Sequence, residues 1–127
     1  MRIVLLHDKN SGIYHSPLSL LGDVLVLPGK AALQEYLLAD TPCDLVVCAL
    51  DGAAGMNCCI TAHSRRRGVP ILWISEQKEF AAQSKRIPVG AFMVKPVAPS
   101  QVFAAAEQLL QKRLLRTPTP TPILRRI

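Results

Sequence analysis

Five short apolar runs recur along the chain, and longer, more polar segments separate them. The runs cover residues 2–6, 23–27, 44–50, 69–75 and 90–94. Their length suits strands rather than helices, and the third and fourth are apolar almost throughout, as is typical of parallel strands covered on both faces. Strands joined by crossovers predict an α/β domain with a single doubly wound, five-stranded parallel sheet flanked by helices.

The segments between the runs carry helix signals of unequal strength. The expected helices are 29–40, 56–67, 76–86 and 99–115. Gly52 and Gly55 indicate a loop before the second of these helices. Residues 10–22 are the weakest segment, because a helix that starts at Ser16 and stops before Gly22 has only about one and a half turns.

Charge is distributed unevenly along the chain, although the formal net charge is only +6. Residues 1–111 hold ten basic and nine acidic side chains, whereas the last sixteen residues add five basic side chains and no acid. The alternation TPTPTP favours extended polyproline II structure. We therefore expect a nearly neutral domain over residues 1–113 and a basic, Thr/Pro-rich tail or linker over 114–127. We expect this tail to bind nucleic acid only weakly. Other contact with nucleic acid is expected only through an output domain outside this chain.

Composition and motifs exclude several classes of protein. No apolar run approaches the roughly 18–20 residues that span a bilayer, and no signal peptide pattern opens the chain. The four cysteines do not form a secreted disulfide framework, so we expect a cytoplasmic protein with no membrane partner. Cys43 and Cys48 lie beside or within the third apolar run and are expected to be buried free thiols. Cys58, Cys59 and His63 lack a paired Cys-x-x-Cys element, which favours a structural helix over a metal site. Neither a GxGxxG motif nor a cysteine follows the first run, so dinucleotide enzymes and cysteine phosphocarriers have no support.

Polar side chains mark the ends of four of the five expected strands. Asp8 follows the first strand, Asp51 the third and Lys95 the fifth, while Ser75 ends the fourth. Sites in parallel sheets form outside the carboxyl ends of the strands, so these side chains are expected at one edge. Asp8 and Asp51 could hold Mg²⁺ there, and Ser75 and Lys95 could contact a phosphoryl group.

Four segments, in the right order, resemble the receiver domain of two-component response regulators, which has the flavodoxin-like fold. They are GAFMVKP (90–96), VPILWIS (69–75), residues 29–47 and the HD pair (7–8). The similarity covers about residues 2–113. It implies that Ser75 and Lys95 recognise a phosphoryl group, that Phe92 is the switch aromatic residue, and that a sensor histidine kinase or other signalling protein is the partner. Residues 73–96 also resemble, more weakly, receivers attached to LytR-type DNA-binding domains.

The chain departs from the family pattern at the residues that carry phosphorylation. The family's acceptor aspartate stands five residues after the aspartate that opens the third strand, and here that count from Asp44 reaches Ala49. The nearest carboxylate is Asp51, which strand alternation places on the same side as Ala49. His7 replaces the first acid of the usual pair, and Phe92 has no hydroxyl. The loss of carboxylates weakens Mg²⁺ binding, and the loss of the acceptor removes the nucleophile for phosphoryl transfer.

Two functions compete on this basis. The first is a receiver-like signalling module, a pseudo-receiver that is not phosphorylated in the usual way, is not an enzyme, and acts through protein–protein interaction or dimerisation. The alternative is an active phosphorelay receiver, which transfers a phosphoryl group to its own Asp51 with magnesium and regulates an output domain. An Ala49 methyl facing Lys95 would support the first hypothesis, and an Asp51 carboxylate there would overturn it. The expected interface is the fifth strand with its flanking helices, whose apolar side chains are Phe80, Ala91, Phe92, Val102 and Phe103.

Overall fold

The computed structural model describes residues 1–7, 12–39, 41–87 and 89–116. The strands are β1 (Arg2–Leu6), β2 (Asp23–Leu27), β3 (Leu45–Cys48), β4 (Ile71–Ser75) and β5 (Ala91–Val94). The helices are α1 (Gly12–Ser19), α2 (Lys30–Leu38), α3 (Gly52–Arg65), the short 3-10 helix η1 (Lys78–Phe80), α4 (Ala81–Arg86) and α5 (Pro99–Arg116). Asp8 and residues 117–127 of the predicted tail lie outside the described residues.

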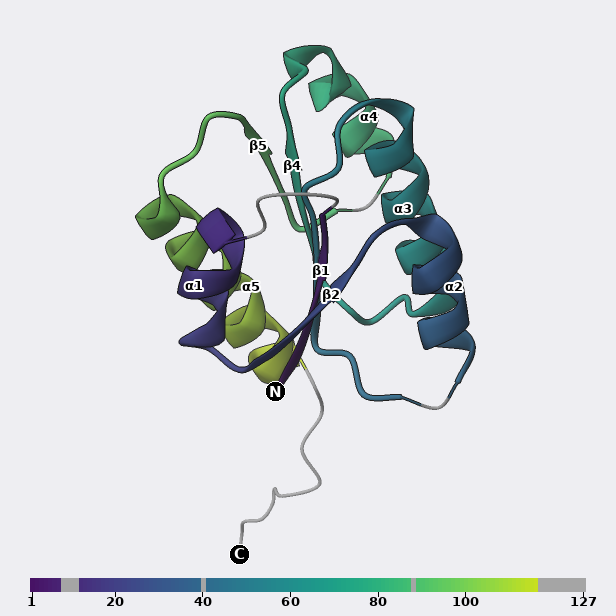
Figure 1. Ribbon diagram of the computed structural model, residues 1–127, viewed down its shortest axis with the longest axis vertical. Helices are drawn as coiled ribbons and strands as arrows, with labels where there is room; N and C mark the ends of the chain where they lie inside the picture. Colours follow the sequence, from purple (N-terminus) through teal and green to yellow (C-terminus); the bar gives the residue numbers. More distant parts are fainter. Residues whose placement is uncertain (8–11, 40, 88, 117–127) are drawn as a thin grey trace, which may run out of the picture.

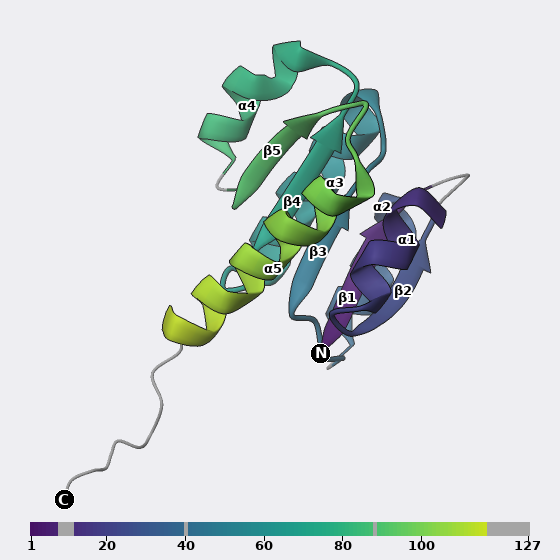
Figure 2. The same cartoon turned by 90° about the vertical axis from the view of Figure 1, so that its left-hand side faces the viewer.

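The strands form one parallel sheet in the order β2-β1-β3-β4-β5. Helices α1 and α5 cover one face of the sheet, and α2 and α3 cover the other (Figure 1). All strands run in the same direction, so their carboxyl ends meet at one edge and their amino ends at the opposite edge (Figure 2). The predicted doubly wound α/β fold is confirmed.

Side chains of the central strands alternate between two apolar cores. On β1, Ile3 and Leu5 face the core under α1 and α5, whereas Val4 and Leu6 face the core under α2 and α3. All four side chains are completely buried. A strand with both faces buried has no polar positions, which explains why its sequence is a continuous apolar run.

Trp73, in the middle of β4, is the largest completely buried side chain. The ring of Phe80 lies 5.4 Å from its ring, and the ring of Phe92 lies 5.0 Å away in an edge-on arrangement. Among the described residues, the indole Nε1 of Trp73 has no hydrogen-bond partner. Trp73 therefore belongs to the core, and Phe80 and Phe92 pack against it.

Helix α3 begins at Gly52, so the loop predicted over residues 52–55 is wrong. Gly52 has a φ of 67°, a left-handed conformation that turns the chain sharply out of β3. Gly55 lies in the first turn of the helix, where a Cβ would overlap the carbonyl oxygen of Leu50. The two glycines therefore serve a tight turn and a close approach, and do not prevent the helix from forming.

Helix α1 begins at Gly12, earlier than the helix start predicted at Ser16, and contains Pro17 in its interior. Its sequence lacks a strong helical period, and proline removes one backbone hydrogen bond. Tyr14 and Leu18 are nevertheless buried in the core shared with α5. Packing on the sheet and on α5 thus stabilises a helix that is weak in isolation.

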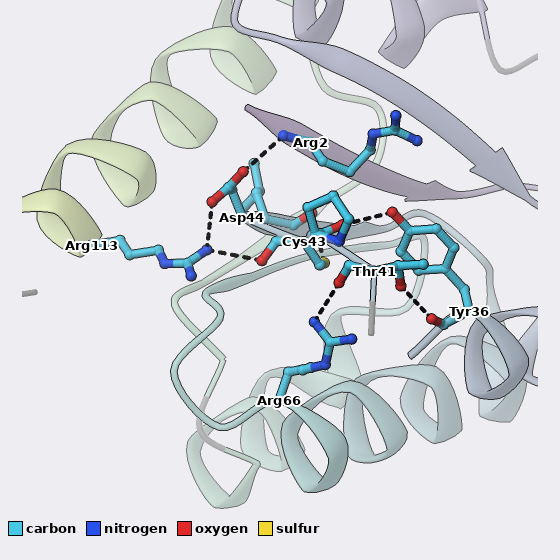
Figure 3. Close-up of polar contacts among 9 residues, drawn as sticks. Arg2, Tyr36, Thr41, Cys43, Asp44, Arg66 and Arg113 are labelled. Atoms are coloured by element: carbon cyan, nitrogen blue, oxygen red, sulfur yellow. Dashed lines mark hydrogen bonds and ion pairs between the residues drawn. The ribbon is translucent and has the colours of Figure 1, made fainter. Parts of the chain in front are cut away.

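The amino edge of the sheet is closed by two arginines (Figure 3). Arg66 donates hydrogen bonds of 2.8 to 3.1 Å to three carbonyl oxygens of residues 37–41. Arg113, on α5, donates to the carbonyl oxygen of Cys43 at 2.9 Å and pairs with Asp44 Oδ1 at 3.1 Å. These contacts fasten α3 and α5 to the loop between α2 and β3.

The four cysteines are free and buried, which confirms the prediction for Cys43 and Cys48. Burial raises the pKa of the Cys43 thiol from 9.0 to about 11. A hydrogen bond with Cys48, together with burial, raises the pKa of Cys58 far above its ordinary value. Within the described ranges, no group of three His, Cys, Asp or Glu side chains could hold a metal ion. The helices of the same ranges include none that is long and apolar enough to cross a membrane.

Candidate functional site

Lys95 and Asp51 meet at the carboxyl edge of the sheet. Lys95 Nζ lies 3.0 Å from Asp51 Oδ1 and donates a hydrogen bond to the carbonyl oxygen of Ala49 at 2.9 Å. The backbone N–H of Lys95 donates to the carbonyl oxygen of Ser75 at 2.8 Å, which holds the end of β5 against β4. The lysine therefore links the end of β5 to the segment that follows β3.

The carboxylate of Asp51 is directed across the sheet edge and not toward its own helix. Asp51 immediately precedes α3, but its side chain makes no capping hydrogen bond there. Its Oδ1 instead accepts a hydrogen bond of 3.1 Å from the backbone N–H of Glu76, at the start of the loop after β4. An aspartate before a glycine often hydrogen-bonds to the backbone of its own turn, but the donor to Asp51 lies on another segment. Asp51 thus joins the segments that follow β3, β4 and β5.

The other predicted site residues are placed differently. Ser75 is almost completely buried, and its Oγ accepts the backbone N–H of Gln77 at 3.2 Å. Phe92 is half-buried with its ring on Trp73. Asp8 lies outside the described residues. The structure therefore brings Asp51 and Lys95 together, while the hydroxyl of Ser75 and the ring of Phe92 are engaged in local packing.

One aromatic side chain that the sequence did not indicate as a site residue, Tyr14, lies beside the lysine, and the ring of His7 packs on it. The ring of Tyr14 on α1 lies 6.0 Å from Lys95 Nζ, within the range of a cation–π contact. The ring of His7, which follows β1, lies 5.2 Å from the ring of Tyr14. Tyr14 belongs to the segment with the weakest helical pattern, so nothing in the sequence connected it with the end of β5. These rings give the lysine a partly apolar environment.

The charges at this edge do not suit a divalent cation. Asp51 is the only predicted metal ligand among the described residues, and its Oδ1 already faces the ammonium group of Lys95. Mg²⁺ requires an octahedral set of oxygen ligands and is usually held through carboxylates with free oxygens. Among the described residues, Asp51 is the one predicted ligand at this edge, and a single carboxylate provides a poor site for magnesium.

Removing the Asp51–Lys95 pair should cost a small, measurable part of the stability. We expect Asp51→Asn and Lys95→Met each to lower the free energy of unfolding by about 1 kcal/mol, with a coupling energy of about 0.5–1 kcal/mol between them. The effect is modest because 40% of the Asp51 side chain and 18% of the Lys95 side chain are exposed to water. Urea denaturation of the double-mutant cycle measures the coupling. A double-mutant cycle between Lys95→Met and Glu79→Gln should give no coupling energy. Equal coupling energies in the two cycles would contradict the ion pair between Asp51 and Lys95.

No family model matches the chain, and no curated protein matches it.

Solved structures do match. A CheY-like receiver domain protein from Methanospirillum hungatei is 18% identical, with a TM-score of 0.74, over 90% of this chain and 96% of that chain. The response regulatory domain of mrkE from Klebsiella pneumoniae is 13% identical, with a TM-score of 0.76, over 91% and 100% of the two chains. Response regulator DrrB of Thermotoga maritima is 17% identical, with a TM-score of 0.72, over 87% of this chain and 52% of that chain. The chain therefore has the fold of response regulator receiver domains.

Proposed function

We propose that the protein is a receiver-like signalling module that works without phosphorylation of an aspartate and acts by binding another protein or a second copy of itself. The observation that carries this proposal is the pair of donors on Asp51 Oδ1: Lys95 Nζ at 3.0 Å and the Glu76 N–H at 3.1 Å. The site needs no added anion, because its own carboxylate already accepts from both donors.

A carboxylate beside Lys95 can play two different parts. It can be the nucleophile that receives a phosphoryl group, or it can be a resident anion that takes the place of that group. An anion bound at this edge would be recognised by the ammonium group of Lys95 and by the exposed N–H of Glu76. Asp51 already satisfies both, which favours the role of resident anion. Ala49, at the position where the resemblance expects the acceptor, has no nucleophile: its carbonyl oxygen accepts from Lys95 Nζ, and its N–H donates to the carbonyl oxygen of Leu6.

The groups that would respond to phosphorylation in the resembled family are also engaged. The hydroxyl of Ser75 is buried and accepts from Gln77 N–H, and the ring of Phe92 rests on Trp73. These contacts favour a module whose surface does not change between two states. A sensor kinase, another signalling protein or an attached output domain, including one that binds DNA, would recognise this surface. The free buried thiols fit a reducing compartment such as the cytoplasm.

A second candidate is an active receiver that uses Asp51 as a displaced acceptor. The carboxylate that faces Lys95, at 3.0 Å, is that of Asp51, which is the arrangement expected of this candidate; the Ala49 methyl expected there for the first hypothesis is instead buried in the core. An ammonium group beside the carboxylate would also stabilise the charge that develops during phosphoryl transfer. We prefer the first candidate because the same Oδ1 also accepts from the Glu76 N–H, so both donors are already occupied. The second candidate requires magnesium, for which the described residues provide a poor site. It also requires Asp51 to release Lys95 or Glu76 N–H before the phosphoryl group can bind them.

Phosphodonors separate the two candidates. We expect no phosphoryl adduct in the intact mass of the protein after incubation with acetyl phosphate and Mg²⁺, and no amide chemical shift change at Glu76 with beryllofluoride. An adduct that disappears in Asp51→Asn would overturn the proposal. Asp51→Ala provides the positive control, because it frees both donors: inorganic phosphate should then shift the Glu76 amide of this variant and leave the wild-type amide unchanged.

A further inference from the structure

A cavity of about 340 Å³ opens at the amino ends of β4 and β5, at the opposite edge of the sheet from Asp51 and Lys95. Its walls come from the loop that follows α3, from the loop before β5 and from the last turns of α5. Ligand sites in proteins have volumes of roughly 300–1,000 Å³, so the cavity is large enough for a small molecule.

The ionisable side chains that line this cavity are all of basic residues. They are His63, Arg67, Lys112 and Arg113. Arg113 pairs with Asp44, whereas the ion pairs found within the described residues include none for Arg67 or Lys112. The neighbouring Arg66 closes the loop between α2 and β3 (Figure 3), so its charge serves the fold. Two cations without a carboxylate partner therefore face one cavity.

The three consecutive arginines 65–67 have different roles. The helix dipole of α3 accounts for the first of them but not for the last. Arg65 is the last residue of the helix, where a cation is stabilised by the helix dipole. Arg67 lies beyond the helix end, yet it lines the cavity together with Lys112 from α5. Basic side chains that converge on one cavity from separate elements indicate an anionic ligand.

The remaining walls are apolar or consist of bare backbone. Val69, Pro70, Val89 and Leu109 provide apolar surface. At Gly68, a Cβ would meet no atom within 4 Å, so the backbone at this point is open to the cavity. A ligand with a phosphate at one end and an apolar or aromatic body at the other matches both kinds of wall.

We propose that this cavity binds a small phosphorylated molecule, with its phosphate held by Arg67 and Lys112. The cations surround a hollow and are not spread along a ridge, which favours a small ligand over a nucleic acid strand. The site lies at the opposite edge of the sheet from Asp51, so it does not depend on the function proposed for the carboxyl edge.

Three probes test the site in the full chain: adenosine 5′-monophosphate, inorganic pyrophosphate and adenosine. We expect adenosine 5′-monophosphate and pyrophosphate to shift the amide signals of Gly68, Val69 and Gly90 in a titration followed by NMR. Adenosine should bind at least about tenfold more weakly than its monophosphate, because it lacks the anion. Equal binding of adenosine and its monophosphate, or no binding of either anion at millimolar concentration, would overturn the proposal.

Two glycine variants separate the cavity from a general effect of charge. Gly68→Glu places a carboxylate at the cavity and should weaken binding of adenosine 5′-monophosphate by about tenfold or more. Gly29→Glu makes the same change of charge before α2, also in open space and at an extended φ of 177°, and should leave binding within about twofold. Circular dichroism checks that both variants fold. Equal weakening by both variants would overturn the proposal, as would a duplex oligonucleotide that shifts the cavity amides when neither anion does.

Discussion

Gly55→Ala should lower the free energy of unfolding by about 3 kcal/mol, although alanine is the better helix former. The added Cβ would overlap the carbonyl oxygen of Leu50 and approach Trp73 Nε1 to 3.4 Å. The oxygen belongs to the backbone between β3 and α3, so it cannot move without shifting the start of the helix or the end of the strand. Urea denaturation followed by far-ultraviolet circular dichroism measures the loss.

The sign of this effect distinguishes packing from helix propensity. On propensity alone, alanine inside a helix is favoured over glycine by about 1 kcal/mol. Gly68→Ala, in the loop after α3, is the control for adding a Cβ without a clash, because the new Cβ meets open space there, and it should raise the stability by about 0.4–1 kcal/mol or leave it unchanged. A Gly55→Ala variant as stable as the wild type would show that α3 does not pack this closely on Leu50.

Alkaline pH should destabilise the protein through its buried thiols. A group whose pKa is higher in the folded protein than in the unfolded chain stabilises the fold below the unfolded pKa, and this contribution is lost as the pH rises toward the folded pKa. The pKa of Cys43 rises from 9.0 to about 11 on burial. The stability should therefore fall by about 1.4 kcal/mol per pH unit in this window, or about 3 kcal/mol in all, through Cys43 alone. Cys58, whose pKa is raised by its hydrogen bond with Cys48 and by burial, adds to the slope.

Cys43→Ala isolates the contribution of this thiol. The variant should lose about 1 kcal/mol at pH 7 because of the small cavity, and its stability should then fall less steeply than that of the wild type between pH 9 and pH 11. Val47→Ala, which also leaves a cavity in the core but removes no thiol, should keep the wild-type slope. Guanidinium denaturation in the presence of a reducing agent measures the free energy of unfolding of the wild type and of both variants. Parallel pH profiles for the wild type and Cys43→Ala would contradict the raised pKa.

The sequence predicts the strands well and the helix starts less well, for a physical reason. The bounds of β1 and β2 coincide with their apolar runs. β1 is covered on both faces and so requires a continuous apolar sequence, whereas β2 is a partly exposed edge strand. The start of α1 is set by contacts with a distant segment, and that of α3 by a close approach of its first turn to the end of the preceding strand segment. Tyr14 and Leu18 pack in the α5 core, and Gly55 lies against Leu50, and no local pattern reports either contact.

The same limit applies to the carboxyl edge. Asp51 and Lys95 could be placed together because the ends of parallel strands share one edge. The parts played by the N–H of Glu76 and the carbonyl of Ala49 could not be predicted from the sequence. Nearly every residue carries such groups, and only the tertiary fold decides which of them reach a charged side chain. The orientation of the Ser75 side chain could not be predicted for a similar reason. Its hydroxyl oxygen accepts a hydrogen bond from the N–H of Gln77, two residues away.

The packing of Trp73 also gives the molecule an intrinsic optical reporter. The chain has a single tryptophan, so all indole emission comes from this one buried ring. An indole in an apolar environment emits at shorter wavelength than one in water, and the two phenylalanine rings in contact with it come from η1 and β5. Any partner that displaces either element will change the colour or intensity of this emission, so binding at that side of the sheet can be followed by fluorescence without attaching a dye.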